Sequence, residues 1–180
     1  MKKIFTAIVF CGMAFSEVVV AATNEPLATY KATKELAEKD FKIAKNKCDD
    51  MTGNPKDICV AVAKADRTRM SANANAVYKN TFSARTSATK DIANADYVVA
   101  KANCGSQVGN DKDVCIKKAD AVKISSIANA TASKKVSEAK SDAKADKLEA
   151  NYQVAVEKCD VLVGTAKEMC LSAAKTKYQQ

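Results

Sequence analysis

The sequence contains no histidine and no tryptophan. Histidine is the commonest metal ligand and the commonest general base near neutral pH, so its absence argues against most hydrolases and against zinc or haem sites. No glycine-rich phosphate loop, Gly-x-Ser-x-Gly elbow or nucleotide motif occurs either. The sequence therefore nominates no catalytic residue, no metal site and no cofactor, and it predicts a protein that is not an enzyme.

Glycine and proline are also scarce, with five and two in 180 residues. These residues interrupt helices, so their scarcity predicts long helices. Aromatic residues make up only 6% of the chain, whereas alanine and lysine dominate it. This composition is typical of an all-α, elongated bundle whose helices meet along thin, alanine-rich seams.

The N-terminus has the pattern of a secretory signal. Two lysines precede an apolar stretch over 4–15, and small residues follow over 18–22, which predicts cleavage after Ala22. An uncleaved anchor is disfavoured, because a bilayer span needs roughly 18–20 apolar residues and no later segment comes closer. A lipid attachment at Cys11 is disfavoured because the residue before it is the bulky Phe10. We expect an exported protein, periplasmic or fully secreted, without a transmembrane segment after cleavage.

Removal of the signal segment 1–22 leaves a single helical repeat domain over 23–180. It would carry 27 basic and 20 acidic side chains, a net charge of +7, because the segment contains two lysines and one glutamate. A basic surface favours anionic partners. The six remaining cysteines would face an oxidising compartment, where paired thiols are the expected state.

The cysteines belong to an internal repeat. Three segments that begin at Lys47, Asn103 and Lys158 align without gaps, and the two intervals between their first cysteines are both close to eight heptads. Each segment holds one Cys-x10-Cys pair. The predicted disulfides are Cys48–Cys59, Cys104–Cys115 and Cys159–Cys170.

Each repeat contains a helix stop followed by a helix start, which predicts a corner over 48–59, 104–115 and 159–170. A glycine stands where the preceding helix needs a left-handed residue, the next residue is suited to an N-cap, and an acidic residue three positions later completes a capping box. Pro55 fits the first helical position. The glycines are Gly53, Gly109 and Gly164, the N-caps Asn54, Asn110 and Thr165, and the acidic residues Asp57, Asp113 and Glu168.

Two features of the corners have functional alternatives. The cysteines could exchange thiols or bind Cu(I) with help from Met51 and Met169, but no Cys-x-x-Cys motif accompanies them, which favours structural disulfides. A lysine recurs in the first turn after each corner (Lys56, Lys112 and Lys167). It could form a cationic site, although local ion pairs in a solvated turn are commoner.

The corners divide the chain into four expected helices, two long and two short. The middles of the two long helices are rich in Ser, Asn and Thr, which have low helix propensity, so a kink or local fraying is possible there. In an up-down arrangement, corners one and three share one end and four helices bundle there. The expected helices cover about 27–51, 56–104, 111–163 and 166–178, with weak middles at 71–90 and 125–144.

A coiled-coil seam leads into each corner. An aromatic residue lies seven positions before the first cysteine and an alanine four before it, and Ala37 and Met51 extend this spacing in the first repeat. The aromatic residues are Phe41, Tyr97 and Tyr152, and the alanines are Ala44, Ala100 and Ala155.

The motif KCDxxxGxxKDxC, followed by a helix rich in alanine and lysine, resembles a group of uncharacterised exported proteins of proteobacteria, some of them labelled TolA-like by composition. The resemblance covers the three corners and implies no catalytic or binding residues. Unlike TolA, this chain has no internal membrane anchor, so a role in energising the envelope is not implied. The stretch KVSEAKSDAKADKLEA is similar in composition to late-embryogenesis-abundant stress proteins.

Three functions follow as hypotheses. The first is a non-enzymatic periplasmic protein, structural or interacting, that presents helical surfaces to envelope proteins. The second is a cationic binder of anionic envelope polymers such as lipopolysaccharide, with no specific recognition of nucleic acid. The third is stress protection by a partly unfolded, hydrophilic chain. The sequence leaves the oligomeric state open.

Overall fold

The computed structural model describes residues 25–180, so the predicted signal segment lies outside the described part. Within that part all the regular secondary structure is helical, with short turns between the helices and no strand. None of its helices is both long enough and apolar enough to cross a membrane. The elements are α1 (Glu25–Lys47), α2 (Gly53–Lys79), α3 (Phe82–Asn103), the short 3₁₀ turn η1 (Cys104–Ser106), α4 (Gly109–Cys159) and α5 (Gly164–Tyr178).

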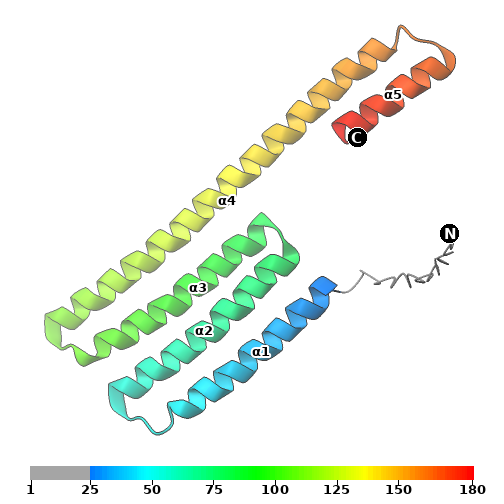
Figure 1. Cartoon of the computed structure of the whole chain (residues 1–180). Coiled ribbons are helices and arrows are strands. Elements are labelled where there is room, and N and C mark those ends of the chain that lie inside the picture. Colours follow the sequence, from blue (N-terminus) through cyan, green and yellow to red (C-terminus); the bar gives the residue numbers. More distant parts are fainter. Residues whose placement is uncertain (1–24) are drawn as a thin grey trace, which may run out of the picture.

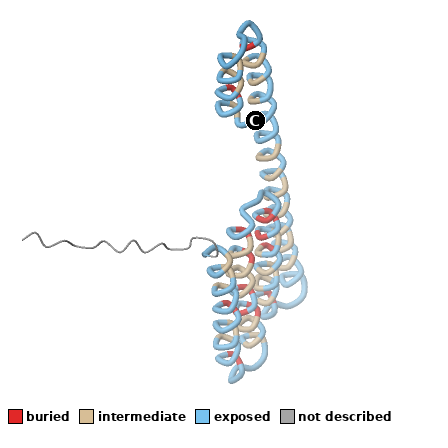
Figure 2. The backbone as a smooth tube through the Cα atoms, turned by 90° about the vertical axis from the view of Figure 1, so that its right-hand side faces the viewer, coloured by how far each residue is buried: buried red, intermediate tan, exposed pale blue. Residues whose placement is uncertain are grey.

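The helices form an open, elongated array in which each α-helix packs mainly against its neighbours in the sequence. Helices α1 to α4 run up and down side by side, and α4 continues far beyond α3 to carry α5 at its distant end (Figure 1). We call α5 and the part of α4 beside it the arm. Between the two regions α4 runs alone, and residues 139–147 are all exposed (Figure 2).

The first predicted long helix is wrong, because the chain reverses at Asn80 and Thr81 and gives five α-helices instead of four. Asn80 adopts the left-handed conformation, with φ 47° and ψ 36°, and its N–H bonds to the carbonyl of Ala76. The Thr81 hydroxyl then accepts a hydrogen bond of 3.0 Å from the N–H of Ala84. This is a complete helix stop and helix start. By contrast, α4 runs unbroken for 51 residues, about 76 Å.

The extra reversal changes which corners share an end. Corners one and two lie together, whereas corner three stands alone at the far end of α4, so the predicted bundle of corners one and three is wrong (Figure 1). Gly105 of corner two faces the side chain of Asn54 of corner one so closely that a Cβ at position 105 would overlap its amide. The missing side chain therefore allows the two corners to meet.

All three predicted disulfides are present. Their Cα–Cα separations are 5.7, 5.8 and 5.8 Å. Cys48, Cys104 and Cys159 are the largest fully buried side chains in the described chain, and the other buried apolar residues are all alanines. The disulfides thus supply much of the bulk at the centre of each corner, which the thin helix contacts do not.

The predicted capping chemistry of the corners needs correction. The three glycines do adopt positive φ values of 62°, 55° and 60°, but each is the first residue of the following helix instead of the cap of the preceding one. The residues just before them, Thr52, Val108 and Val163, hold the N-cap positions and make no side-chain capping bond. Asn54, Asn110 and Thr165 therefore already lie within the first helical turn, past the position from which a side chain caps it. Asp57, Asp113 and Glu168 accordingly do not complete capping boxes with them.

The seam before corner one follows the predicted spacing as far as the cysteine. Ala37 and Cys48 are buried, and Phe41 and Ala44 between them are half-buried. Met51, expected to continue the seam, is exposed instead. The reason is that α1 ends at Lys47 and the chain then turns, which takes position 51 off the helical face.

Replacement of a corner glycine by alanine should lower the free energy of unfolding by about 1 kcal/mol, because alanine adopts positive φ at a cost of that order. Gly164→Ala isolates this backbone effect, since a Cβ there would meet no atom within 4 Å. Urea unfolding measures the change. Gly164→Asn is the control, because asparagine tolerates this conformation better and should lose less. Equal losses for the two variants would contradict the account.

Candidate functional site

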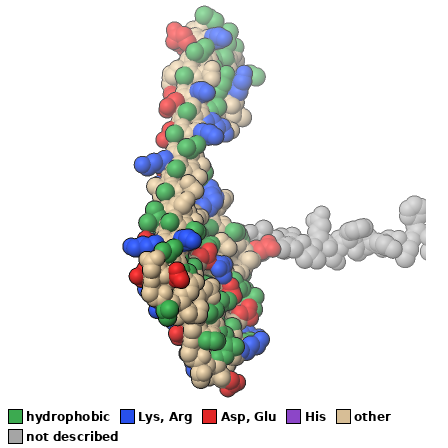
Figure 3. Space-filling view, turned by 90° about the vertical axis from the view of Figure 1, so that its left-hand side faces the viewer, with side chains coloured by type: hydrophobic (Ala, Val, Ile, Leu, Met, Phe, Trp, Pro, Cys, Tyr) green, Lys and Arg blue, Asp and Glu red, His purple; other side chains and the backbone are tan. Residues whose placement is uncertain are grey.

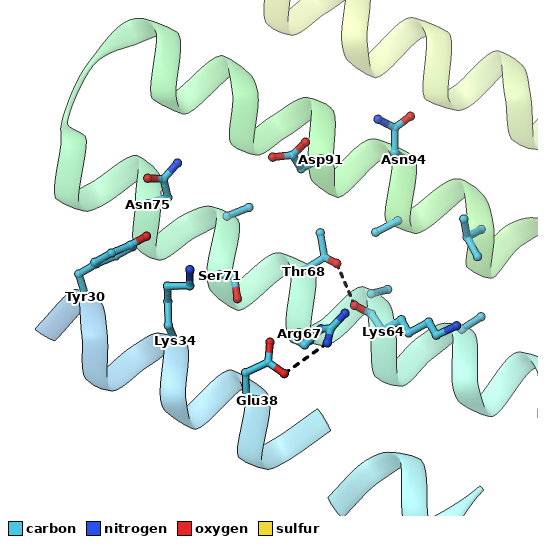
Figure 4. Close-up of a pocket in the computed structure, with 15 residues that line it drawn as sticks. Tyr30, Lys34, Glu38, Lys64, Arg67, Thr68, Ser71, Asn75, Asp91 and Asn94 are labelled. Atoms are coloured by element: carbon cyan, nitrogen blue, oxygen red, sulfur yellow. Dashed lines mark hydrogen bonds and ion pairs between the residues drawn. The ribbon is translucent and has the colours of Figure 1, made fainter. Parts of the chain in front are cut away.

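A groove of about 780 Å³ crosses α1, α2 and α3. Its floor is α2, where the small side chains of Ala61, Ala65 and Ala72 are buried. The walls are formed by α1 on one side and α3 on the other (Figure 4). We call this feature the three-helix groove. Its small-residue floor would let the backbone of a bound segment approach α2 closely.

The walls of the three-helix groove carry polar groups of both charges. On the α1 side, Glu38 accepts a hydrogen bond of 3.3 Å from Arg67, and Figure 4 shows Lys34 reaching over α2 toward Ser71. On the α3 side stand Asp91 and Asn94 (Figure 4). The groove thus offers hydrogen-bond donors and acceptors along both edges, a pattern suited to a polar partner segment.

Tyr30, which lines the three-helix groove, stacks on a second aromatic ring. The rings of Tyr30 on α1 and Tyr78 on α2 lie 4.8 Å apart between centroids and nearly parallel, at 15°. The ammonium group of Lys34 lies 5.6 Å from the centroid of Tyr30. Stacked aromatic pairs of this kind contribute about 0.5–1.5 kcal/mol beyond the area they bury. They hold the start of α1 against the end of α2.

The seam aromatics have partners that sequence reasoning missed. Arg67 stands 4.3 Å from the ring centroid of Phe41, and Lys123 stands 4.3 Å from that of Tyr97. Arg67 and Lys123 occupy the same position in the alignment of the repeats, and the third repeat has Tyr178 at that position. A comparison of the aligned repeats at this position could have found the pairing in the first two.

Lys123 also forms the ion pair with the clearest effect on ionisation. Its ammonium nitrogen lies 2.6 Å from a carboxylate oxygen of Asp120. The hydrogen bond from Lys123 lowers the pKa of Asp120 below its usual value, and the same bond raises the pKa of Lys123. Both side chains are half-buried and still reach solvent, so the pair orients the lysine over Tyr97 more than it stabilises the fold.

The first-turn lysines make local contacts in two of the three corners. Lys167 pairs with Asp160 at 2.9 Å, and Lys56 donates to the carbonyl of Asp49 at 3.2 Å. In corner two, Gly105 stands where the other repeats have these aspartates, so Lys112 has no equivalent carboxylate. The contact of Lys167 is a local ion pair, whereas that of Lys56 is a hydrogen bond to the main chain, and neither contact gathers the lysines into one cationic site.

The thiols that redox exchange or Cu(I) binding would need are joined in pairs. The first cysteine of each pair is at most 1% exposed, which shields it from an attacking thiolate. Within residues 25–180, no group of three or more Cys, Asp or Glu side chains is placed to hold a metal ion. Met51 and Met169 are exposed at the corners.

Corner three is unusually apolar at its surface. Val161 and Val163 are 85% and 84% exposed, and Met169 in the first turns of α5 is 73% exposed. At the equivalent positions corner one has Asp50, Thr52 and Ile58. Hydrophobic side chains are visible at this end of the arm in Figure 3. Exposed apolar residues gathered at one point are typical of contact surfaces.

No protein-family model, curated protein or solved structure matches the chain. Its function is therefore inferred from the arrangement of its own residues.

Proposed function

We propose that this is a non-enzymatic, exported helical protein that presents surfaces to partner proteins of the cell envelope. The observation that carries the proposal is the single-layer arrangement of its helices. Because α1, α2 and α3 lie side by side, a groove of about 780 Å³ stays open across them, with no helix of the described chain laid over it. Three disulfides are compatible with an oxidising compartment.

The exposure of large apolar side chains supports the same proposal. Val77, Val98 and Val122 are each more than half exposed although they belong to regular helices. Each of the three valines also lines a hollow of the surface, where a partner's side chains could cover it. Corner three adds an apolar tip at the other end of the molecule, so the chain could bridge two partners.

The proposal is tested by photo-crosslinking in intact cells from position 75, where Asn75 lines the three-helix groove. We expect one defined protein adduct, identified by mass spectrometry. Ser71→Arg in the same chain should abolish that adduct, because the arginine would fill the groove. A crosslinker at Ser141, in the exposed single-helix part of α4, is the control and should give no such adduct. An adduct that survives Ser71→Arg would contradict the role of the groove.

A second candidate function is the binding of anionic envelope polymers, and the distribution of charge favours it. Residues 51–137 carry 14 basic and 7 acidic side chains, whereas residues 23–50 and 138–180 are each balanced. The whole excess of +7 therefore lies on α2, α3 and the first part of α4. Binding to dextran sulfate should weaken steeply between low and high salt. Binding that is independent of salt would contradict this electrostatic function.

A further inference from the structure

A second polar groove, of about 510 Å³, runs along the seam between α3 and α4. We call it the α3–α4 groove. Its α4 wall carries Ser126, Asn129, Ser133 and Ser137, which are spaced by three or four positions and so lie on one face of the helix. These residues belong to the segment 125–144, where the low helix propensity of the sequence left a kink in the helix open. The helix is intact there, and its hydroxyl and amide groups line an open groove.

Thr86 on α3 lines the same groove and is the polar residue that the described chain buries, at 9% exposed. Its hydroxyl makes no hydrogen bond to another protein group in residues 25–180, unlike that of Thr89, which donates to the carbonyl of Arg85 at 3.1 Å. No side-chain oxygen in this part is both wholly inaccessible and unpartnered, so the Thr86 oxygen is reached from the groove. Since water reaches this hydroxyl in the unbound protein, a ligand hydroxyl placed in the groove can take the place of that water and bond Thr86 directly.

Cationic groups and one aromatic face stand at the rim. The Arg85 guanidinium lies 5.0 Å from the ring centroid of Phe82 and donates to the Asn80 side chain at 2.9 Å. On the other side Lys134 pairs with Glu138 at 2.8 Å. Both cations belong to the segment that holds the whole excess positive charge. The rim thus combines a held guanidinium, an ammonium group and a partly exposed ring.

We propose that the α3–α4 groove binds a phosphorylated saccharide. Sugar hydroxyls would bond Thr86 and the polar side chains of α4, and Arg85 and Lys134 would attract the phosphate. Ser126 also lines a second cavity between α3 and α4, together with Tyr97 and Lys123, and a saccharide of more than one ring could extend toward it. This inference rests on the second candidate function and assigns it a site.

The test uses the oxidised chain and glucose 6-phosphate as the probe, with amide chemical shifts followed by NMR. We expect shifts in α3 and α4 around Thr86, with much weaker responses to glucose or to inorganic phosphate alone. Thr86→Val should weaken binding at least tenfold without lowering the melting temperature, because it removes an unpartnered hydroxyl and keeps the shape. A purely structural threonine would not separate these two effects.

Thr131→Val is the matched control, because Thr131 is on α4 outside the groove and donates to the carbonyl of Ile127 at 2.8 Å. It should leave binding unchanged. Equal binding by Thr86→Val and the original chain would overturn the site. Equal affinity for phosphate and glucose 6-phosphate would overturn saccharide recognition. If either of these results is obtained and dextran sulfate still binds the protein, the polymer-binding function stands and only the proposed site is wrong. If dextran sulfate does not bind, the polymer-binding function and the site are both wrong.

Discussion

Removal of the third disulfide by Cys159→Ala with Cys170→Ala is expected to undock and unfold α5, while α1 to α4 keep their structure. A disulfide that closes a loop this short stabilises by about 3 kcal/mol on the chain-entropy model. The arm has little to replace it, because only Cys159 and Ala174 are buried there. An isolated helix of 15 residues is marginal in water. Hydrogen exchange should show amide protection lost throughout α5.

The same double substitution in corner one, Cys48→Ala with Cys59→Ala, is the matched comparison. Helix α1 should stay docked there, because Tyr30 stacks on Tyr78 and Arg67 bonds Glu38 and covers Phe41. We expect a lower free energy of unfolding with α1 still protected from exchange. Protection of α5 that survives loss of the third disulfide would show that the helix contacts suffice without it.

The corners could be predicted from the sequence because their signals are local. Cysteine spacing, a glycine and a first-turn acidic residue recur within one short segment in each of three aligned copies. The disulfides and the positive φ of Gly53, Gly109 and Gly164 follow from them. The capping bonds did not, because the helices begin two residues earlier than capping by the Asn and Thr side chains requires.

The reversal between α2 and α3 falls in the weak middle at 71–90, where the sequence left a kink or fraying open, but no glycine or proline marks a full reversal there. Asparagine also adopts the left-handed conformation, and threonine starts a helix, so Asn80 and Thr81 together form a stop and a start. When Cys104 and Cys159 are aligned, the positions of Asn80 and Thr81 correspond to Lys135 and Val136 in the next repeat. Neither residue caps a helix, and α4 continues.

The grooves depended on that reversal and so could not be predicted. The three-helix groove needs α1 and α3 on either side of α2, an order that exists only because the chain turns at Asn80. The α3–α4 groove brings Thr86 beside Ser126 and Asn129, which lie far from it in the sequence. Helix propensity reports what a segment does alone, whereas these sites depend on which helices become neighbours.

Substitution of Ala88 by leucine is expected to lower the free energy of unfolding by about 1–3 kcal/mol, because it overfills a tightly packed seam. Ala88 is 4% exposed and packs with Ala72 and Ala76 of α2 and with Ile92. The added side chain must push α3 away from α2 or adopt a strained rotamer. Urea unfolding of the oxidised protein measures the loss, and the exchange of α2 amides should quicken with it.

Ala143→Leu is the control that the repeat itself provides. Ala143 corresponds to Ala88 when Cys159 is aligned with Cys104, yet Ala143 is exposed on the single-helix part of α4. Leucine has nearly the same helix propensity as alanine, so this substitution should change stability little. Similar losses at both positions would mean that α2 and α3 do not pack closely. A loss at Ala88 alone would measure the contact between α2 and α3. That contact exists because the chain reverses at Asn80 and Thr81, and the next repeat lacks it because α4 continues without a reversal.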